Sequence, residues 1–209
     1  MRNWRARPTT TGDRFIGTIT GVGTTTGVRL VVGHWRESPW GDFADVMVED
    51  ADGHRVLLAP HPRVADFVAA TYTFDEVRIE DIELEGVASG FTLRSKSLNV
   101  HVGYGKRTPL GRILRLVPRQ VATAPAWCAV TDPIARMFLR GVRTRGTAGG
   151  GRRECYGATD IHAVVSVTGT WADADLGDLA PVDPPCRFGF SSVPPSPSRT
   201  HLVTTVRRG

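Results

Sequence analysis

Positive charge is concentrated in one segment of this sequence. Residues 103–155 carry 11 basic and two acidic side chains, a net charge of +9, whereas residues 1–102 carry −3 and residues 156–209 carry −1. Nearly all of these cations are arginines, whose planar guanidinium groups match the geometry of carboxylates and phosphates. Such a concentration raises the local density of anions, so the segment predicts an anionic partner.

The candidate ligand-binding residues are seven arginines and two aromatic residues of this segment: Arg112, Arg115, Arg119, Arg143, Arg145, Arg152, Arg153, Tyr104 and Trp127. The first three are spaced i, i+3 and i+7, which places them in one row on a helix. The last two arginines follow three glycines, whose backbone N–H groups can converge on an anion. The aromatic residues are of the amphipathic kind that lines the mouth of a pocket. A solvated helix face and a mobile surface loop are the competing interpretations.

Asp160 and His162 form the local acid–base pair that the sequence offers. In an extended strand, residues at i and i+2 share a face and lie about 7 Å apart, within reach of proton transfer through a shared substrate. Two polar residues that face solvent are the alternative interpretation. The six histidines show neither HxH nor HExxH spacing and the cysteines form no CxxC pair, so we predict no metal site and no cofactor.

The elements that must position these residues are mostly strands. Runs rich in β-branched and aromatic residues predict strands at 15–20, 28–35, 43–49 and 55–58, arranged as two hairpins. Pro62 and an apolar i, i+3, i+4 pattern predict a helix that ends near Tyr72. The next two apolar runs, 77–84 and 91–102, each change phase by one residue, which we interpret as β-bulges, the first of them near Glu80. Long strands with such phase changes favour a strongly bent sheet or a barrel.

The rest of the chain alternates between helix and strand signals. Thr108 and Pro109 begin a predicted helix that presents Leu110, Ile113, Leu114 and Val117 to the core and ends before Pro118. A second helix is expected at 133–141 and a loop at 144–151. A central strand at 161–167, irregular structure at 172–198 and a last strand at 201–206 follow.

These patterns predict a β-rich fold, mainly antiparallel, with a bent sheet or barrel and about three short helices; an α+β fold is the alternative. We expect residues 1–13 to form a flexible arm and residues 14–209 a single domain, with a helical, basic insertion around 103–155. A chain of 209 residues is long enough to bury a proper core without crosslinks.

The expected location is the cytoplasm. No apolar run approaches the roughly 20 residues that cross a bilayer, and the arginines near the N-terminus precede no apolar signal segment. Cys128, Cys155 and Cys186 are odd in number, which argues against a disulfide framework. The preference for arginine, 24 residues against two lysines, also fits a GC-rich genome.

Three functions remain open at this level. The first is the binding of a small anionic or amphipathic ligand in a β-barrel-like cavity, with the arginines as an anion clamp. The second is a binding module for nucleic acid or an acidic protein; the few aromatic residues in the basic segment speak against single-stranded nucleic acid. The third is an oligomeric structural protein whose basic segment contacts the acidic half of another copy. The sequence does not decide whether the protein is an enzyme.

Overall fold

The computed structural model describes residues 13–122, 124, 127, 145–147, 153–189 and 191–207. Its strands in the first half of the chain are β1 (Asp13–Thr24), β2 (Arg29–Glu37), β3 (Phe43–Glu49), β4 (Arg55–Ala59), β5 (Glu76–Ile79), β6 (Glu83–Val87), β7 (Gly90–Arg94) and β8 (Leu98–Arg107). Those in the second half are β9 (Arg145–Thr147), β10 (Arg153–Trp171), β11 (Ala174–Asp175), β12 (Leu179–Ala180) and β13 (Ser198–Arg207). The helices are α1 (Pro62–Ala69), α2 (Pro109–Leu114) and α3 (Arg119–Ala122).

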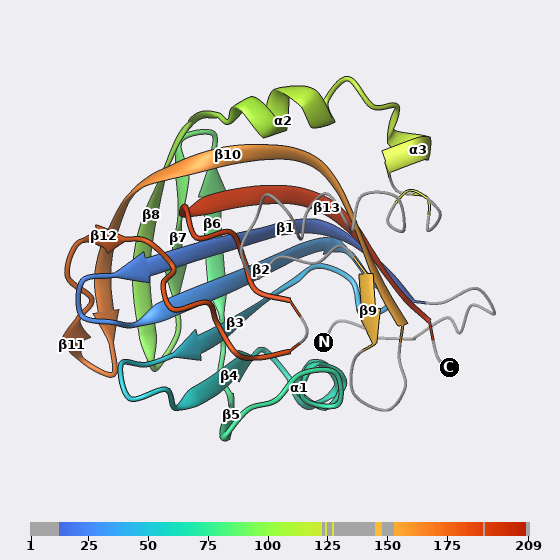
Figure 1. Ribbon diagram of the computed structural model, residues 1–209. Helices are drawn as coiled ribbons and strands as arrows, with labels where there is room; N and C mark the ends of the chain where they lie inside the picture. Colours follow the sequence, from blue (N-terminus) through green and yellow to red (C-terminus); the bar gives the residue numbers. More distant parts are fainter. Residues whose placement is uncertain are drawn as a thin grey trace.

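All of these strands belong to one curled sheet. Its main path runs β5-β4-β3-β2-β1-β13-β10-β8-β7-β6, while β9 and β11 pair with β10 and β12 pairs with β1. Neighbours on the path are antiparallel except β4 and β5. Figure 1 shows β10 and β13 arching over the molecule, with β8, β7 and β6 curling behind β1 and β2. The expected β-rich, mainly antiparallel bent sheet with three short helices is therefore confirmed for the described residues.

Both N-terminal hairpins form as expected. β1 pairs with β2, and β3 pairs with β4 through a turn in which Gly53 has a φ of 85°, a left-handed conformation that glycine adopts without strain. The long central strand is also present, because β10 lies between β13 and β8.

The prediction of two β-bulges is wrong, because separate strands stand where each bulge was expected. β5 and β6 lie at opposite edges of the sheet and are separated by only three residues, Glu80–Ile82. The second phase change falls at the turn between β7 and β8, at residues 95–97. A strand that ends and restarts elsewhere changes the apolar phase as a bulge does, so the pattern alone does not separate the two cases. Because so short a link joins the two edge strands, the sheet must curl so that they approach each other, although β5 and β6 are not paired in the described residues.

The side chain of Glu80 stabilises the curl of the sheet through hydrogen bonds to Ser97. Its carboxylate accepts the backbone N–H of Ser97 at 2.9 Å and the Ser97 hydroxyl, while Arg78 donates to the Ser97 Oγ at 3.0 Å. The bonds join the end of the edge strand β5 to the turn between β7 and β8, so they hold one end of the curled sheet to the other.

We expect Glu80→Ala to lower the free energy of unfolding by about 1–3 kcal/mol, because it leaves the half-buried Ser97 groups without an acceptor. Urea unfolding followed by circular dichroism measures the change. Glu83→Ala, which removes an exposed carboxylate from β6, is the matched control and should change the free energy of unfolding by less than about 0.5 kcal/mol. Equal effects of the two substitutions would show that Glu80 does not hold the edges.

The curled sheet separates two apolar layers. Inside the curl, residues of β1–β4 pack against residues of β7, β8 and β10, with Leu30, Leu58, Leu93 and Val100 fully buried. On the other face, β1, β3 and β4 pack against α1, which lies along the lower edge of the sheet in Figure 1. Residues 182–189 cover the neighbouring part of that face through Val182, Cys186 and Phe188.

The helix α2 does not present its apolar residues to the core as expected. Ile113 is 60% exposed and Leu110 37% exposed, whereas Gly111 is buried. A Cβ at Gly111 would clash with the carbonyl oxygen of Ile161, so the helix approaches β10 through its glycine rather than its leucines.

Several other expectations have mixed outcomes. The expected arm, apart from Asp13 in β1, and the expected helix at 133–141 lie outside the described residues. The expected loop at 144–151 contains a strand, β9, which pairs with the start of β10. Cys155 is disulfide-bonded, so the odd number of cysteines did not exclude a disulfide, and the cytoplasmic location stays a prediction. No helix in the described part of the chain is long and apolar enough to cross a membrane.

Candidate functional site

A cavity of about 430 Å³ opens inside the curl of the sheet. Its volume lies in the range of small-molecule sites. One wall is polar and comes from β1, β2 and β13: Thr18, Thr20, His34, Arg36, Arg199 and His201. The facing wall comes from β6, β7 and the turn between them and is mainly apolar, with Leu84, Val87 and Phe91. The cavity therefore has a cationic side and an apolar side.

Strand register brings the polar side chains together. On β13, Arg199 lies opposite Thr20 of β1, and His201 lies opposite Thr18, which in turn lies opposite His34 of β2. Residues two apart on a strand share a face, so each strand contributes a pair of polar residues to the same wall. The pairing of β2 with β1 is irregular at Arg36, which lies between two paired residues and has no partner residue on β1.

Arg199 is a cation without an anionic partner among the described residues. Its guanidinium carbon lies 4.6 Å from the centre of the Tyr104 ring, and its Nε is buried without a hydrogen bond in the described part of the chain. Burial and the neighbouring Arg36 lower the pKa of Arg199, while Tyr104 opposes this shift. A partly desolvated guanidinium that keeps free donors is a ready-made site for an anion.

The histidines of the cavity are neutral near pH 7. Burial, followed by repulsion from Arg199, lowers the pKa of His201 to about 4. Burial also lowers the pKa of His34, although its Nε2 lies 3.6 Å from the exposed carboxylate of Asp42, which opposes the shift. His162 lies behind His201, with ring centres 6.0 Å apart, and its Nδ1 is buried without a partner among the described residues. The fixed positive charge of the cavity therefore comes from its two arginines.

His201 makes stability depend on pH. Its pKa of about 4 in the folded protein is below the ordinary histidine value of 6.5, so the unfolded chain binds more protons between these values. The free energy of unfolding that depends on His201 is therefore at its full value above pH 6.5 and falls as the pH is lowered toward 4. We expect His201→Gln to flatten this slope in urea unfolding measured across that range. His101→Gln, on the exposed face of β8, should keep the wild-type slope; an unchanged slope in His201→Gln would contradict the assignment.

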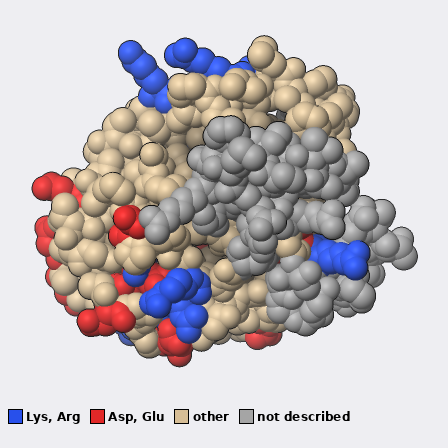
Figure 2. Space-filling model, viewed as in Figure 1, with Lys and Arg blue, Asp and Glu red and all other residues tan. Residues whose placement is uncertain are grey.

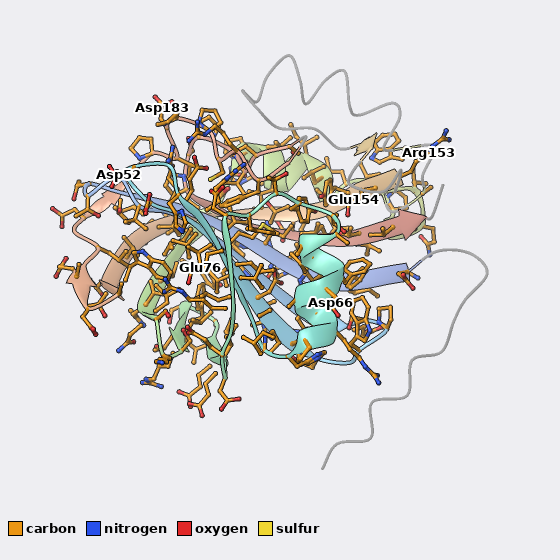
Figure 3. All side chains as sticks on the ribbon, turned by 90° about the horizontal axis from the view of Figure 1, so that it is seen from below. Asp52, Asp66, Glu76, Arg153, Glu154 and Asp183 are labelled. Atoms are coloured by element: carbon orange, nitrogen blue, oxygen red, sulfur yellow. The ribbon has the colours of Figure 1, made fainter. Side chains whose placement is uncertain are left out.

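The structure places few of the expected ligand-binding residues at this cavity. Tyr104 lines it and supports Arg199. Arg112 is exposed on α2, Arg115 is largely exposed with its Nη1 3.8 Å from Asp160, and Arg153 is exposed at the start of β10. Figure 3 shows Arg153 pointing away from the protein.

The remaining candidates are only partly described. Arg143 and Arg152 lie outside the described residues, as do the side chains of Arg119 and Arg145. The backbone N–H of Trp127 donates to Ala124 at 2.9 Å. On the face in Figure 2, lysine and arginine side chains form separate groups, one at the top near α2 and one lower among acidic side chains. Of the described candidates, Arg112 and Arg115 lie at α2, whereas Arg153 lies at the start of β10.

Asp160 and His162 lie side by side on β10, but the carboxylate is engaged elsewhere. Arg107 Nε lies 2.8 and 3.0 Å from the two oxygens of Asp160, and the Ile161 N–H donates to the same carboxylate at 2.9 Å. Burial raises the pKa of Asp160, but the bonds from Arg107 and the charge of His162 outweigh this and lower it overall. Their role as an acid–base pair stays a prediction.

The sequence analysis did not select four ionisable residues that line the cavity: His34, Arg36, Arg199 and His201. The signal was present, because His34 with Arg36 and Arg199 with His201 are ionisable pairs at i and i+2 within strands. Such pairs place two ionisable side chains on one face of a sheet.

Comparison with known proteins yields a distant structural likeness. No family model matches the chain, and no curated protein matches its sequence. An acetoacetate decarboxylase from Legionella pneumophila subsp. pneumophila is 11% identical, with a TM-score of 0.42, over 99% of this chain and 88% of that one. A second acetoacetate decarboxylase structure is 10% identical, with a TM-score of 0.41, over 96% of this chain and 88% of that one. At TM-scores below 0.5, these likenesses support no conclusion about a ligand or a reaction.

Proposed function

We propose that this protein binds a small organic anion, an amphipathic carboxylate, in the cavity inside its curled sheet. The observation that carries the proposal is Arg199, a partly buried guanidinium that has no anionic partner among the described residues and is held in place by Tyr104. Burying such a charge costs free energy, and a bound carboxylate would offset that cost.

The two walls of the cavity favour a ligand that has both a carboxylate group and an apolar part. Arg199 and Arg36 offer paired N–H donors to a carboxylate, and the neutral His201 can add a hydrogen bond. Leu84, Val87 and Phe91 on the facing wall would cover an apolar chain or ring. A compact inorganic anion would leave that apolar wall without contacts, so an organic carboxylate fits better than phosphate alone.

A thermal-shift and calorimetric titration tests this proposal. The probes are hexanoate and benzoate, their neutral analogues 1-hexanol and benzyl alcohol, and inorganic phosphate. A ligand at about 100 times its Kd stabilises by about 2.7 kcal/mol, which raises Tm by about 5–10 °C for a chain of this length. We expect the carboxylates to produce this shift and the alcohols to produce much less. Equal shifts for acids and alcohols would contradict the anion site.

A titration with an oligonucleotide, set beside those with the carboxylates, separates this proposal from nucleic-acid binding. Binding to a DNA or RNA oligonucleotide with a steep salt dependence, without any shift by the carboxylates, would favour the basic segment 103–155 as a nucleic-acid surface and would overturn the proposal.

A further inference from the structure

A second cavity lies on the opposite face of the sheet, between β1–β3, β10, β13 and α1. Its volume is about 50 Å³, room for about four water-sized positions. Six aromatic rings line it, four of which carry no hydroxyl: Phe15, Trp35, Phe43 and Phe67. They pack against one another, with the Phe15 ring centre 5.6 Å from Trp35 and 5.2 Å from Phe67. The cavity is thus small and mainly aromatic.

An acidic side chain faces this aromatic cavity. Asp45 of β3 is 3% exposed and accepts a hydrogen bond of 2.8 Å from Trp35 Nε1. No cation in the described part of the chain acts on it. A carboxylate has about four acceptor positions, so the bond from Trp35 and one from its own backbone N–H leave others free. Asp45 is therefore a buried acid that lacks a counter-ion among the described residues.

A second polar group in the cavity is unsatisfied. Thr204 of β13 is 4% exposed and lines the cavity, and its Oγ1 has no hydrogen-bond partner among the described residues. Leaving a buried hydroxyl unpaired costs about 1–3 kcal/mol. This loss points to an occupant that supplies the missing partner.

The remaining polar groups of the cavity bond to one another. The hydroxyls of Tyr72 and Tyr156 lie 3.0 and 2.7 Å from Glu154 Oε2, and they lie 2.5 Å from each other. Burial raises the pKa of both phenols well above their usual value, so both are neutral donors. Figure 3 shows Glu154 beside α1, on the side of the sheet that this helix covers. These groups leave Asp45 as the acid available to an occupant.

We propose that this second cavity binds a small organic ammonium ion, with Asp45 as its counter-ion. Aromatic faces attract cations through their electron-rich surfaces, and rings around an ammonium group are a recurring mode of recognition. The acid comes from β3 and the rings come from β1, β2, β3, β10, α1 and the loop after α1, and all of them meet in one cavity. The face of the sheet toward α1 would thus carry a cation site, independent of the anion site inside the curl.

A calorimetric titration with ethylammonium, compared with ethanol as its neutral analogue, tests the proposal. We expect ethylammonium to bind, ethanol to bind much more weakly, and Asp45→Asn to lower the affinity for ethylammonium at least about 30-fold. The asparagine keeps an oxygen that can accept from Trp35. Asp66→Asn, on α1 and outside the cavity lining, is the matched control and should bind as the wild type does.

Proton release gives a readout that does not depend on a variant. Burial raises the pKa of Asp45 to about 7, and besides Trp35 the groups that face it are Tyr72, Glu154 and Tyr156. A bound cation favours the ionised carboxyl, so binding near pH 7 should release about half a proton per ligand. Titrations in buffers of different ionisation enthalpy measure it. No binding of ethylammonium, equal binding of ethanol, or binding without proton release would each overturn the proposal.

Discussion

Replacing Arg199 with glutamine should lower the affinity for an amphipathic carboxylate at least about 30-fold, the equivalent of about 2 kcal/mol. The reason is that Arg199 is the cavity's partly desolvated cation, and a neutral amide removes its charge and part of its paired donors. Titration calorimetry with hexanoate measures the loss. Arg36→Gln should cause a smaller loss, because Arg36 is exposed and its charge is screened by water.

The same substitution should leave the unliganded protein at least as stable. A partly buried guanidinium without an anion costs free energy in the folded state, so its removal relieves that cost. The expected result is therefore a Tm no lower than that of the wild type, together with weak binding. Arg112→Gln, on the exposed face of α2, is the control and should keep both Tm and affinity. Equal losses of affinity in the two variants would place the ligand outside the cavity.

Replacing Glu49 with glutamine should lower the free energy of unfolding by about 3–5 kcal/mol, the usual cost of leaving a buried charge unpaired. Glu49 is fully buried and lies 3.2 Å from Arg29 Nη2, and Arg29 is only 4% exposed. Its other partners are the Nε and the backbone N–H of Arg187, at 2.9 and 2.8 Å. The neutral amide removes the counter-charge of Arg29 and half of the acceptors. Guanidinium chloride unfolding measures the effect.

Two further variants test whether the loss of stability comes from the buried ion pair. Glu37→Gln removes an exposed carboxylate at the end of β2 and should change the free energy of unfolding by less than about 0.5 kcal/mol. The double variant Arg29→Met with Glu49→Leu should recover part of the stability that Glu49→Gln loses, because it removes both charges at once. A Glu49→Gln protein as stable as the wild type would show that the ion pair contributes nothing.

Local patterns predicted the parts of the fold that depend on local structure. The hairpins β1–β2 and β3–β4 follow from strand propensity on either side of short turns, and α1 follows from Pro62 and its apolar stripe. The closure of the sheet was not predictable in this way, because it depends on bonds between Glu80 and Ser97, which are distant in sequence. The orientation of α2 was missed because the close approach of Gly111 to Ile161 outweighed an apolar stripe that pointed elsewhere.

The site was harder to predict than the fold, for a physical reason. Summing charge by segment drew attention to residues 103–155, but the arginines of the cavity come from β2 and β13, in segments whose net charge is negative. A cavity is defined by the few charges that face it, and register between distant strands decides which these are. Tyr104 was found because it is an amphipathic aromatic residue within the basic segment, whereas Arg199, which it supports, lies outside that segment and was not found.

A crystal structure of the protein soaked with 6-bromohexanoate, located through the anomalous signal of bromine, is the most direct measurement of where an anion sits. The account predicts a carboxylate about 2.7–2.9 Å from the guanidinium nitrogens of Arg199, with the bromine against Leu84 and Phe91. Bromine at the outer surface near Arg112, with the cavity inside the sheet holding only water, would contradict it.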